Sequence, residues 1–166
     1  MIYETTGSYQ IDRLDGSGEE LLTTVFNDPA YAVWINGFRK ADRDLYLETS
    51  RRREAELNGS FLEQWGASYS DVEADMRSEV EKAVRMVSTF LARLTNLRLA
   101  TVTVTEDSSV FFQARHGNLH GYLEIHFGDD LPVEMLYNIY RNKAPISAFE
   151  GTVEQSLSHY LRVIRA

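Results

Sequence analysis

The sequence predicts an α+β fold in two layers, with N-terminal helices followed by a five-stranded antiparallel β-meander and a C-terminal helix. Apolar residues recur with helical period from about residue 17 to 96 and with strand period from about 98 to 150. A capped helical segment, 152–165, then closes the chain. No linker, repeat or low-complexity tract divides the 166 residues, so we expect a single domain over 1–166.

The first helices are marked by two N-terminal signals. Ser17 opens an S-x-x-E capping box, and Asp28 is an N-cap followed by Pro29 at the first helical position. We expect the helix after Pro29 to end at Asn58-Gly59, because Gly is a common helix stop. Its predicted buried face consists of Trp34, Phe38, Ala41 and Leu45.

The most regular helical pattern follows Ser70, which forms a second capping box with Glu73. Its acidic residues lie in the first half and, apart from Arg77, its basic residues lie in the second half, an order that suits the helix dipole without any binding partner. The apolar positions expected to face the core are Val72, Met76, Val80, Ala83, Val87, Leu91 and Leu94.

The last helix is predicted to begin at a third capping box, formed by Thr152 and Gln155. Its expected buried positions are Val153, Leu157, Leu161 and Ile164.

Turn signals set the register of the predicted sheet, whose strands are approximately 99–105, 109–116, 119–127, 133–141 and 144–149. Turns are predicted at 106–108, at Gly117-Asn118, over 128–132 and at Asn142-Lys143. All four place apolar residues on one face, and a slip of one residue would break that agreement. The opposed pairs are Val104/Val110, Val102/Phe112, Val110/Ile125, Phe112/Leu123, Ala114/Gly121, Ile125/Met135, Leu123/Tyr137 and Ile139/Ile146.

The opposite face of the predicted sheet carries polar and aromatic residues together. It is too polar for a core and too aromatic for an ordinary solvated surface, and Tyr and Arg are enriched in protein interfaces. The candidate partner-binding residues are Phe111, Arg115, His120, Tyr122, Glu124, Tyr140 and Phe149. The alternative is that residues 1–13 or an N-terminal helix pack against this face.

Composition limits the function classes. The chain has 25 acidic and 17 basic residues, a formal net charge of -8, and no cysteine. A disulfide framework, a zinc–thiolate site and a thiol nucleophile are therefore excluded, and the composition fits a reducing compartment. No apolar run approaches the roughly 20 residues that span a bilayer, and the first ten residues do not resemble a signal peptide. We expect a cytoplasmic protein of bacterial or mobile-element origin with no membrane partner.

No catalytic, cofactor or metal site is predicted. The sequence has no nucleophile elbow, phosphate-binding loop, zincin motif or dinucleotide fingerprint. His120 and His126 share a face but lie roughly 20 Å apart along one strand, too far to ligate one ion, and His116 faces the other way. The enzyme hypothesis that remains is acid–base chemistry by Glu124 with Tyr122 or His120.

These observations favour a non-catalytic interaction protein, of the immunity-protein, inhibitor, antitoxin or accessory-subunit type. It would bind a protein partner or a second copy of itself through the polar and aromatic face. Single-stranded nucleic acid is the alternative ligand, with aromatic rings stacking on bases and Arg115 on phosphate. The net charge of -8 argues against nucleic acid, because phosphate contact normally requires a basic surface.

Overall fold

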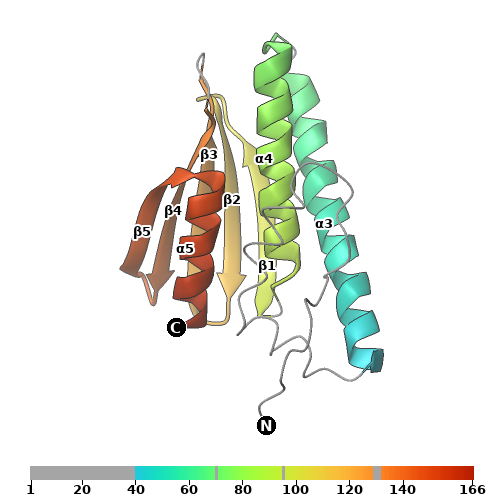
Figure 1. Cartoon of the computed structure of the whole chain (residues 1–166), viewed down its shortest axis with the longest axis vertical. Coiled ribbons are helices and arrows are strands. Elements are labelled where there is room, and N and C mark those ends of the chain that lie inside the picture. Colours follow the sequence, from blue (N-terminus) through green and yellow to red (C-terminus); the bar gives the residue numbers. More distant parts are fainter. Residues whose placement is uncertain (1–39, 70, 95, 129–131) are drawn as a thin grey trace.

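The computed structural model describes residues 40–69, 71–94, 96–128 and 132–166, and it confirms the predicted α+β class. The five strands pair in chain order as an antiparallel meander. The elements in order (Figure 1) are α3 (Lys40–Ser68), α4 (Ala74–Ala92), β1 (Leu97–Val104), β2 (Ser109–His116), β3 (Leu119–His126), β4 (Glu134–Arg141), β5 (Ala144–Thr152) and α5 (Val153–Arg165). The predicted helix starts at Ser17 and Pro29, with Trp34 and Phe38, lie outside the described residues.

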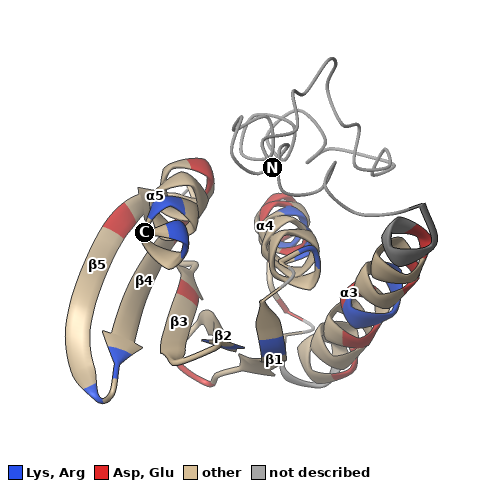
Figure 2. Ribbon diagram, turned by 90° about the horizontal axis from the view of Figure 1, so that it is seen from below, with Lys and Arg blue, Asp and Glu red and all other residues tan. Residues whose placement is uncertain are grey.

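One face of the sheet is covered by helices. α5 packs on β4 and β5, α4 contacts β1 and β3, and α3 lies against α4 and β1. Figure 2 shows α4 and α5 on the same side of the sheet. The apolar stripes of the helices meet the apolar side of the strands there, as expected for a two-layer core. Its largest fully buried side chains include Phe90, Leu91, Phe112, Leu123, Ile125, Met135, Tyr137, Leu157 and Tyr160.

Helix α3 is longer than predicted, because it continues through Asn58-Gly59 to Ser68. An interior Gly costs a helix about 1 kcal/mol relative to Ala. The buried side chains of Leu57, Phe61 and Trp65 offset that cost by packing into the core. Leu45 was predicted to be buried but is 64% exposed, because it lies about 120° away from Leu57 around the helix axis.

Helix α4 begins at Ala74, later than the Ser70 capping box predicts. Glu73 is its N-cap and makes no side-chain capping bond, and Ser70 lies outside the described residues. Val72 precedes the helix and is half-buried. The other predicted core positions are confirmed as buried: Met76, Val80, Ala83, Val87, Leu91 and Leu94.

Helix α5 begins at the predicted capping box. The Thr152 hydroxyl accepts a hydrogen bond from the Gln155 backbone N–H at 3.2 Å, and the Gln155 side chain accepts one from the Thr152 N–H at 3.3 Å. Val153, Leu157 and Leu161 are buried as predicted.

The predicted register is confirmed from β1 to β4 and is wrong along most of β5. Ile139 pairs with Ser147 instead of Ile146, because a β-bulge lies between Ile139 and Tyr140. A bulge adds one residue to one strand and so reverses the face of every residue beyond it. Phe149 therefore lies on the helix-covered face, opposite Tyr137, and not on the polar face where it was predicted.

The outer edge of β1 is hydrogen-bonded by α3. The Gln64 side-chain amide donates to the Val102 carbonyl at 3.1 Å and accepts from the Val104 N–H at 2.9 Å, so it binds β1 as a neighbouring strand would. Arg53 donates to the Leu97 carbonyl at 3.0 Å. Unpaired edge groups are sites of unwanted strand pairing, and α3 occupies them here.

Replacing Gln64 with Met is expected to lower the free energy of unfolding by about 1–2 kcal/mol, because two edge groups of β1 lose their partner. Urea unfolding followed by circular dichroism measures the change. The neighbouring exposed residue Glu63 provides the control, since Glu63→Met should stay within about 0.5 kcal/mol of the parent protein. Equal losses in both variants would contradict a role for the Gln64 amide.

Candidate functional site

The side of the sheet opposite the helices, here named the open face, has no element packed on it in the described part of the chain (Figure 2). Its side chains are exposed or half-buried, in contrast to the alternating positions of β2, β3 and β4, which are buried. They are Leu99, Thr101, Thr103, Phe111, Gln113, Arg115, His120, Tyr122, Glu124, His126, Glu134, Leu136, Asn138, Tyr140, Ala148 and Glu150.

Three aromatic rings from three adjacent strands form a cluster at the centre of the open face. The Tyr122 ring on β3 stacks on the Phe111 ring of β2, with centroids 5.8 Å apart, and meets the Tyr140 ring of β4 edge-on at 5.6 Å. These are diagonal cross-strand neighbours, which aromatic side chains are long enough to bring into contact. The rings are therefore already positioned before any partner binds.

An open hollow of about 830 Å³ lies over this cluster and extends toward the hairpin turns. Asn142 and Lys143 border it from the β4–β5 turn, where both have positive φ, 51° and 67°. Consecutive positive φ values are typical of tight two-residue hairpin turns. The full lining is Phe111, Asn118, His120, Tyr122, Asn138, Tyr140, Asn142 and Lys143.

The charges on and beside the open face are separated along the strands. Arg115 lies near the end where the β2–β3 and β4–β5 turns are, and Lys143 lies in the second of these turns. Figure 2 shows basic residues at the β4–β5 turn. Glu124, Glu134 and Glu150 lie nearer the other end. The row of Gln113, Tyr122 and Asn138 between them is uncharged, so the face has a basic end, a neutral middle and an acidic end.

The structure brings together most of the predicted site residues. Phe111, Tyr122 and Tyr140 form the aromatic cluster, and His120 lines the hollow between Arg115 and Tyr140, as the register predicted.

Of the predicted site residues, only Phe149 leaves the open face, while Arg115 and Glu124 lie on that face outside the hollow. Glu124 does not line the hollow, and its carboxylate oxygen is 3.8 Å from Nδ1 of His126. Phe149 stacks on His159 of α5 with ring centroids 4.0 Å apart, on the helix-covered side of the sheet. Strand alternation places Asn138 on this face, but it does not reveal the lining residues Asn118, Asn142 and Lys143, because the side chain of a turn residue follows no period that shows which face it borders.

The three residues of the acid–base hypothesis occupy successive open-face positions of β3. Tyr122 and His120 line the hollow, but Glu124 lies beyond it. In the described segments, no group of three or more His, Asp or Glu side chains is placed to hold a metal ion. The chemistry that the hollow offers is hydrogen bonding from amides, phenols and an imidazole, with one ammonium group at its border.

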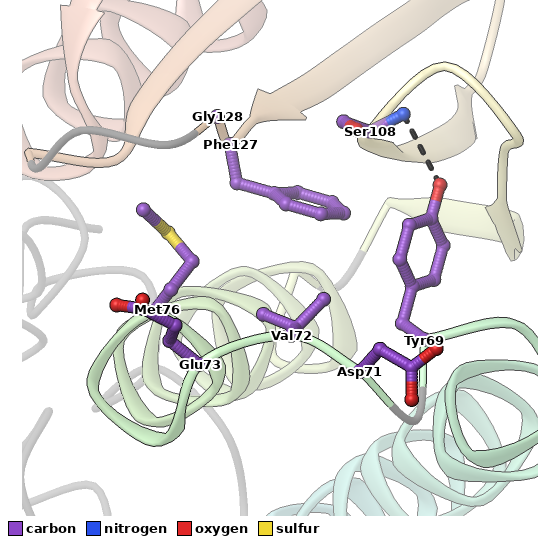
Figure 3. Close-up of a pocket in the computed structure, with 8 residues that line it drawn as sticks. All are labelled: Tyr69, Asp71, Val72, Glu73, Met76, Ser108, Phe127 and Gly128. Carbon is purple, nitrogen blue, oxygen red and sulfur yellow. Dashed lines mark hydrogen bonds between the residues drawn. The ribbon is translucent and has the colours of Figure 1, made fainter.

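A second cavity, of about 480 Å³, lies between the start of α4 and the end of β3. In Figure 3 the side chains of Met76 and Phe127 face a common space, while the carboxylates of Asp71 and Glu73 lie apart at its border. The Tyr69 hydroxyl is occupied, because it accepts from the Ser108 N–H at 3.1 Å and donates to the Thr105 carbonyl. This cavity therefore has an apolar centre without converging polar groups.

The third histidine of interest, His116, faces the core as predicted and is 2% exposed. Its Nε2 lies 2.6 Å from the Tyr160 hydroxyl on α5. Burial lowers the pKa of His116 to about 4, and burial together with the nearby Tyr137 raises the pKa of Tyr160. This pair joins α5 to the sheet and takes no part in the open face.

Comparisons of the chain with protein-family models, with curated proteins and with solved structures gave no match. Within the described ranges, no helix is both long enough and apolar enough to cross a membrane.

Proposed function

We propose that this protein is a non-catalytic interaction module that binds a protein partner through the open face. The observation that carries the proposal is the packed cluster of Phe111, Tyr122 and Tyr140 on a sheet face without a covering element among the described residues. Aromatic side chains bury a large area, and rings that are already held in place lose little freedom on binding.

The surroundings of the cluster have the composition of an interface rim. Asn118, Asn138 and Asn142 border the apolar centre and can each donate and accept hydrogen bonds. An apolar centre enclosed by polar, partly solvated groups is the usual anatomy of a protein interface. A cytoplasmic role as an immunity protein, inhibitor, antitoxin or accessory subunit is part of this proposal.

The charge distribution favours protein over single-stranded nucleic acid as the ligand. Aromatic rings on an open sheet can stack on bases, but a bound strand also needs cations along its phosphates. On and beside the open face, Arg115 and Lys143 occupy one end, and three carboxylates lie toward the other. A nucleic acid that crossed the whole face would bring its phosphates close to those carboxylates.

The double variant Tyr122→Ala/Tyr140→Ala is expected to weaken association with a protein partner by roughly 100-fold or more while the fold survives. Both rings are only half-buried, so their loss leaves the core intact. The measurement is quantitative mass spectrometry of proteins from the native host that cross-link to the immobilised chain, together with the solution mass of the chain itself.

The matched control is Leu45→Ala/Leu62→Ala, which removes two exposed apolar side chains of α3, away from the open face. Association that survives the tyrosine substitutions unchanged would contradict the assignment of this face. If the chain shifts the mobility of single-stranded RNA at low salt, and the tyrosine variant does not, then the ligand of this face is nucleic acid and not a protein.

A further inference from the structure

The basic end, neutral middle and acidic end of the open face make it complementary to itself. We propose that its occupant is a second copy of this chain, packed face to face with its strands antiparallel across the interface. The two-fold axis would cross the strands at the row that contains Gln113, Tyr122 and Asn138. This inference rests on the proposed function and identifies the partner.

The direction of the axis follows from the positions of the charges. An axis across the strands reverses the strand direction and lays the basic end of one copy over the acidic end of the other. An axis along the strands would lay like charges over each other, which costs binding energy. Every contact in a two-fold interface occurs twice, so the difference in electrostatic energy between the two axis directions is also doubled.

The same geometry predicts which side chains meet. Arg115 and Glu124 lie on neighbouring strands, each one row away from the axis and on opposite sides of it. Rotation about the axis therefore brings Arg115 of each copy within reach of Glu124 of the other. In the same way Lys143, in the β4–β5 turn, approaches Glu134 of the second copy. Tyr122 lies on the axis, at the centre of the interface, where hot-spot residues concentrate.

The size of the face suits a reversible dimer. Five strands about 4.8 Å apart, with about 3.3 Å per residue along each strand, give a surface of roughly 20 by 25 Å. That is near the lower limit of the area that specific interfaces bury on each partner, roughly 600–1,000 Å² of accessible surface. We therefore expect dimerisation to depend on concentration in roughly the micromolar range.

The test is the solution mass of the full chain, measured by light scattering over a dilution series, with 19.0 kDa as the mass of one copy. We expect Arg115→Glu and Glu124→Arg each to weaken the dimer by at least roughly tenfold, because each places like charges together. An equimolar mixture of the two variants should form a heterodimer, and both substitutions in one chain should restore the homodimer. Within one chain the two residues lie roughly 13 Å apart along the strands, so an intrachain pair does not explain rescue.

Charge reversals away from the open face are the control, and Glu63→Arg on α3 and Arg162→Glu on α5 should leave the dimer unchanged. The second-copy inference is overturned if the parent protein stays monomeric at several hundred micromolar, which is roughly a hundred times the expected dissociation constant. In that case cross-linking with the tyrosine variant still decides the proposed function.

A dimer that is weakened by Tyr122→Ala but is not rescued in the mixture of the charge variants overturns the antiparallel geometry. A dimer whose stability is unchanged by Tyr122→Ala and by both charge reversals overturns the second-copy inference. Self-association would then no longer support the proposed function.

Discussion

Replacing Gly121 with Ala is expected to lower the free energy of unfolding by about 3 kcal/mol. Gly121 lies within β3 on the helix-covered face, opposite Ala114 and Ile139. A Cβ atom at this position would be 1.8 Å from the Tyr160 hydroxyl oxygen and 2.7 Å from the ring carbon that carries it. Contacts below 3.0 Å essentially never occur for real Cβ atoms, so Tyr160 or the strand must move.

Tyr160 has little space into which it can move. Its ring meets Phe90 and Tyr137 edge-on, with centroid distances of 5.9 and 5.4 Å, and its hydroxyl is hydrogen-bonded to His116. A shift of the ring would break that bond and leave a buried hydroxyl without its partner, at a further cost of about 1–3 kcal/mol. The substitution therefore acts on the contact between α5 and the sheet.

Urea unfolding of the Gly121→Ala variant, followed by circular dichroism, measures this loss. Gly59→Ala is the matched control, because nothing lies within 4 Å of a Cβ at that position in α3, and Ala in a helix interior should stabilise the protein by about 0.5–1 kcal/mol. Adding Tyr160→Leu to Gly121→Ala should recover part of the stability by removing the clashing ring. A Gly121→Ala variant as stable as its parent would contradict the contact.

Acidification is expected to remove about 3 kcal/mol of stability through His116 alone. Burial lowers the pKa of His116 to about 4 in the folded protein, from the usual histidine value of 6.5. Between these values the unfolded chain binds the proton and the folded protein does not. The stabilisation is therefore complete above about pH 6.5 and is lost as the pH falls toward 4.

The environment of His116 explains the direction of this shift. The ring is buried, Nε2 is hydrogen-bonded to the Tyr160 hydroxyl, and Nδ1 has no hydrogen-bond partner among the described residues. A second proton on this ring would place an unsolvated charge against the apolar core.

Chemical denaturation of the parent protein and of His116→Asn, at pH values from 7 to 4, tests the effect. The Asn variant should be less stable at pH 7 but should lose less stability on acidification. The matched control is a histidine on the surface, changed in the same way by His159→Asn. Identical pH slopes for the parent and His116→Asn would refute a role of His116 in acid sensitivity.

The register of the first four strands was predictable because each of these strands is buried on one side only. A one-residue slip would have exchanged Leu123 for Tyr122 in the core. The fifth strand was not predictable in the same way, because the bulge near Pro145-Ile146 inserts one residue without any periodic signal. This one inserted residue is the whole reason why Phe149 was predicted on the wrong face of the sheet.

Local signals also failed where packing outweighed them. Gly59 is a reasonable helix stop in isolation, but α3 continues because Leu57, Phe61 and Trp65 gain more from burial than the glycine costs. The aromatic centre of the candidate site, formed by Phe111, Tyr122 and Tyr140, could be predicted from the alternation of side chains along the strands. Its border could not, because turn residues such as Asn142 come into contact with the site only through the pairing of distant strands.

The Gln64 amide beside β1 also limits how many molecules can join through strand pairing. In the part of the chain that the structure describes, α3 occupies one edge of the sheet and β5 forms the other. In polymer terms the described sheet offers at most one reactive edge, because α3 occupies the β1 edge. Two such units can couple, β5 beside β5, and growth then terminates, whereas a fibril requires two reactive edges in every unit. Opening the β1 edge would turn a chain terminator into a monomer capable of polymerisation.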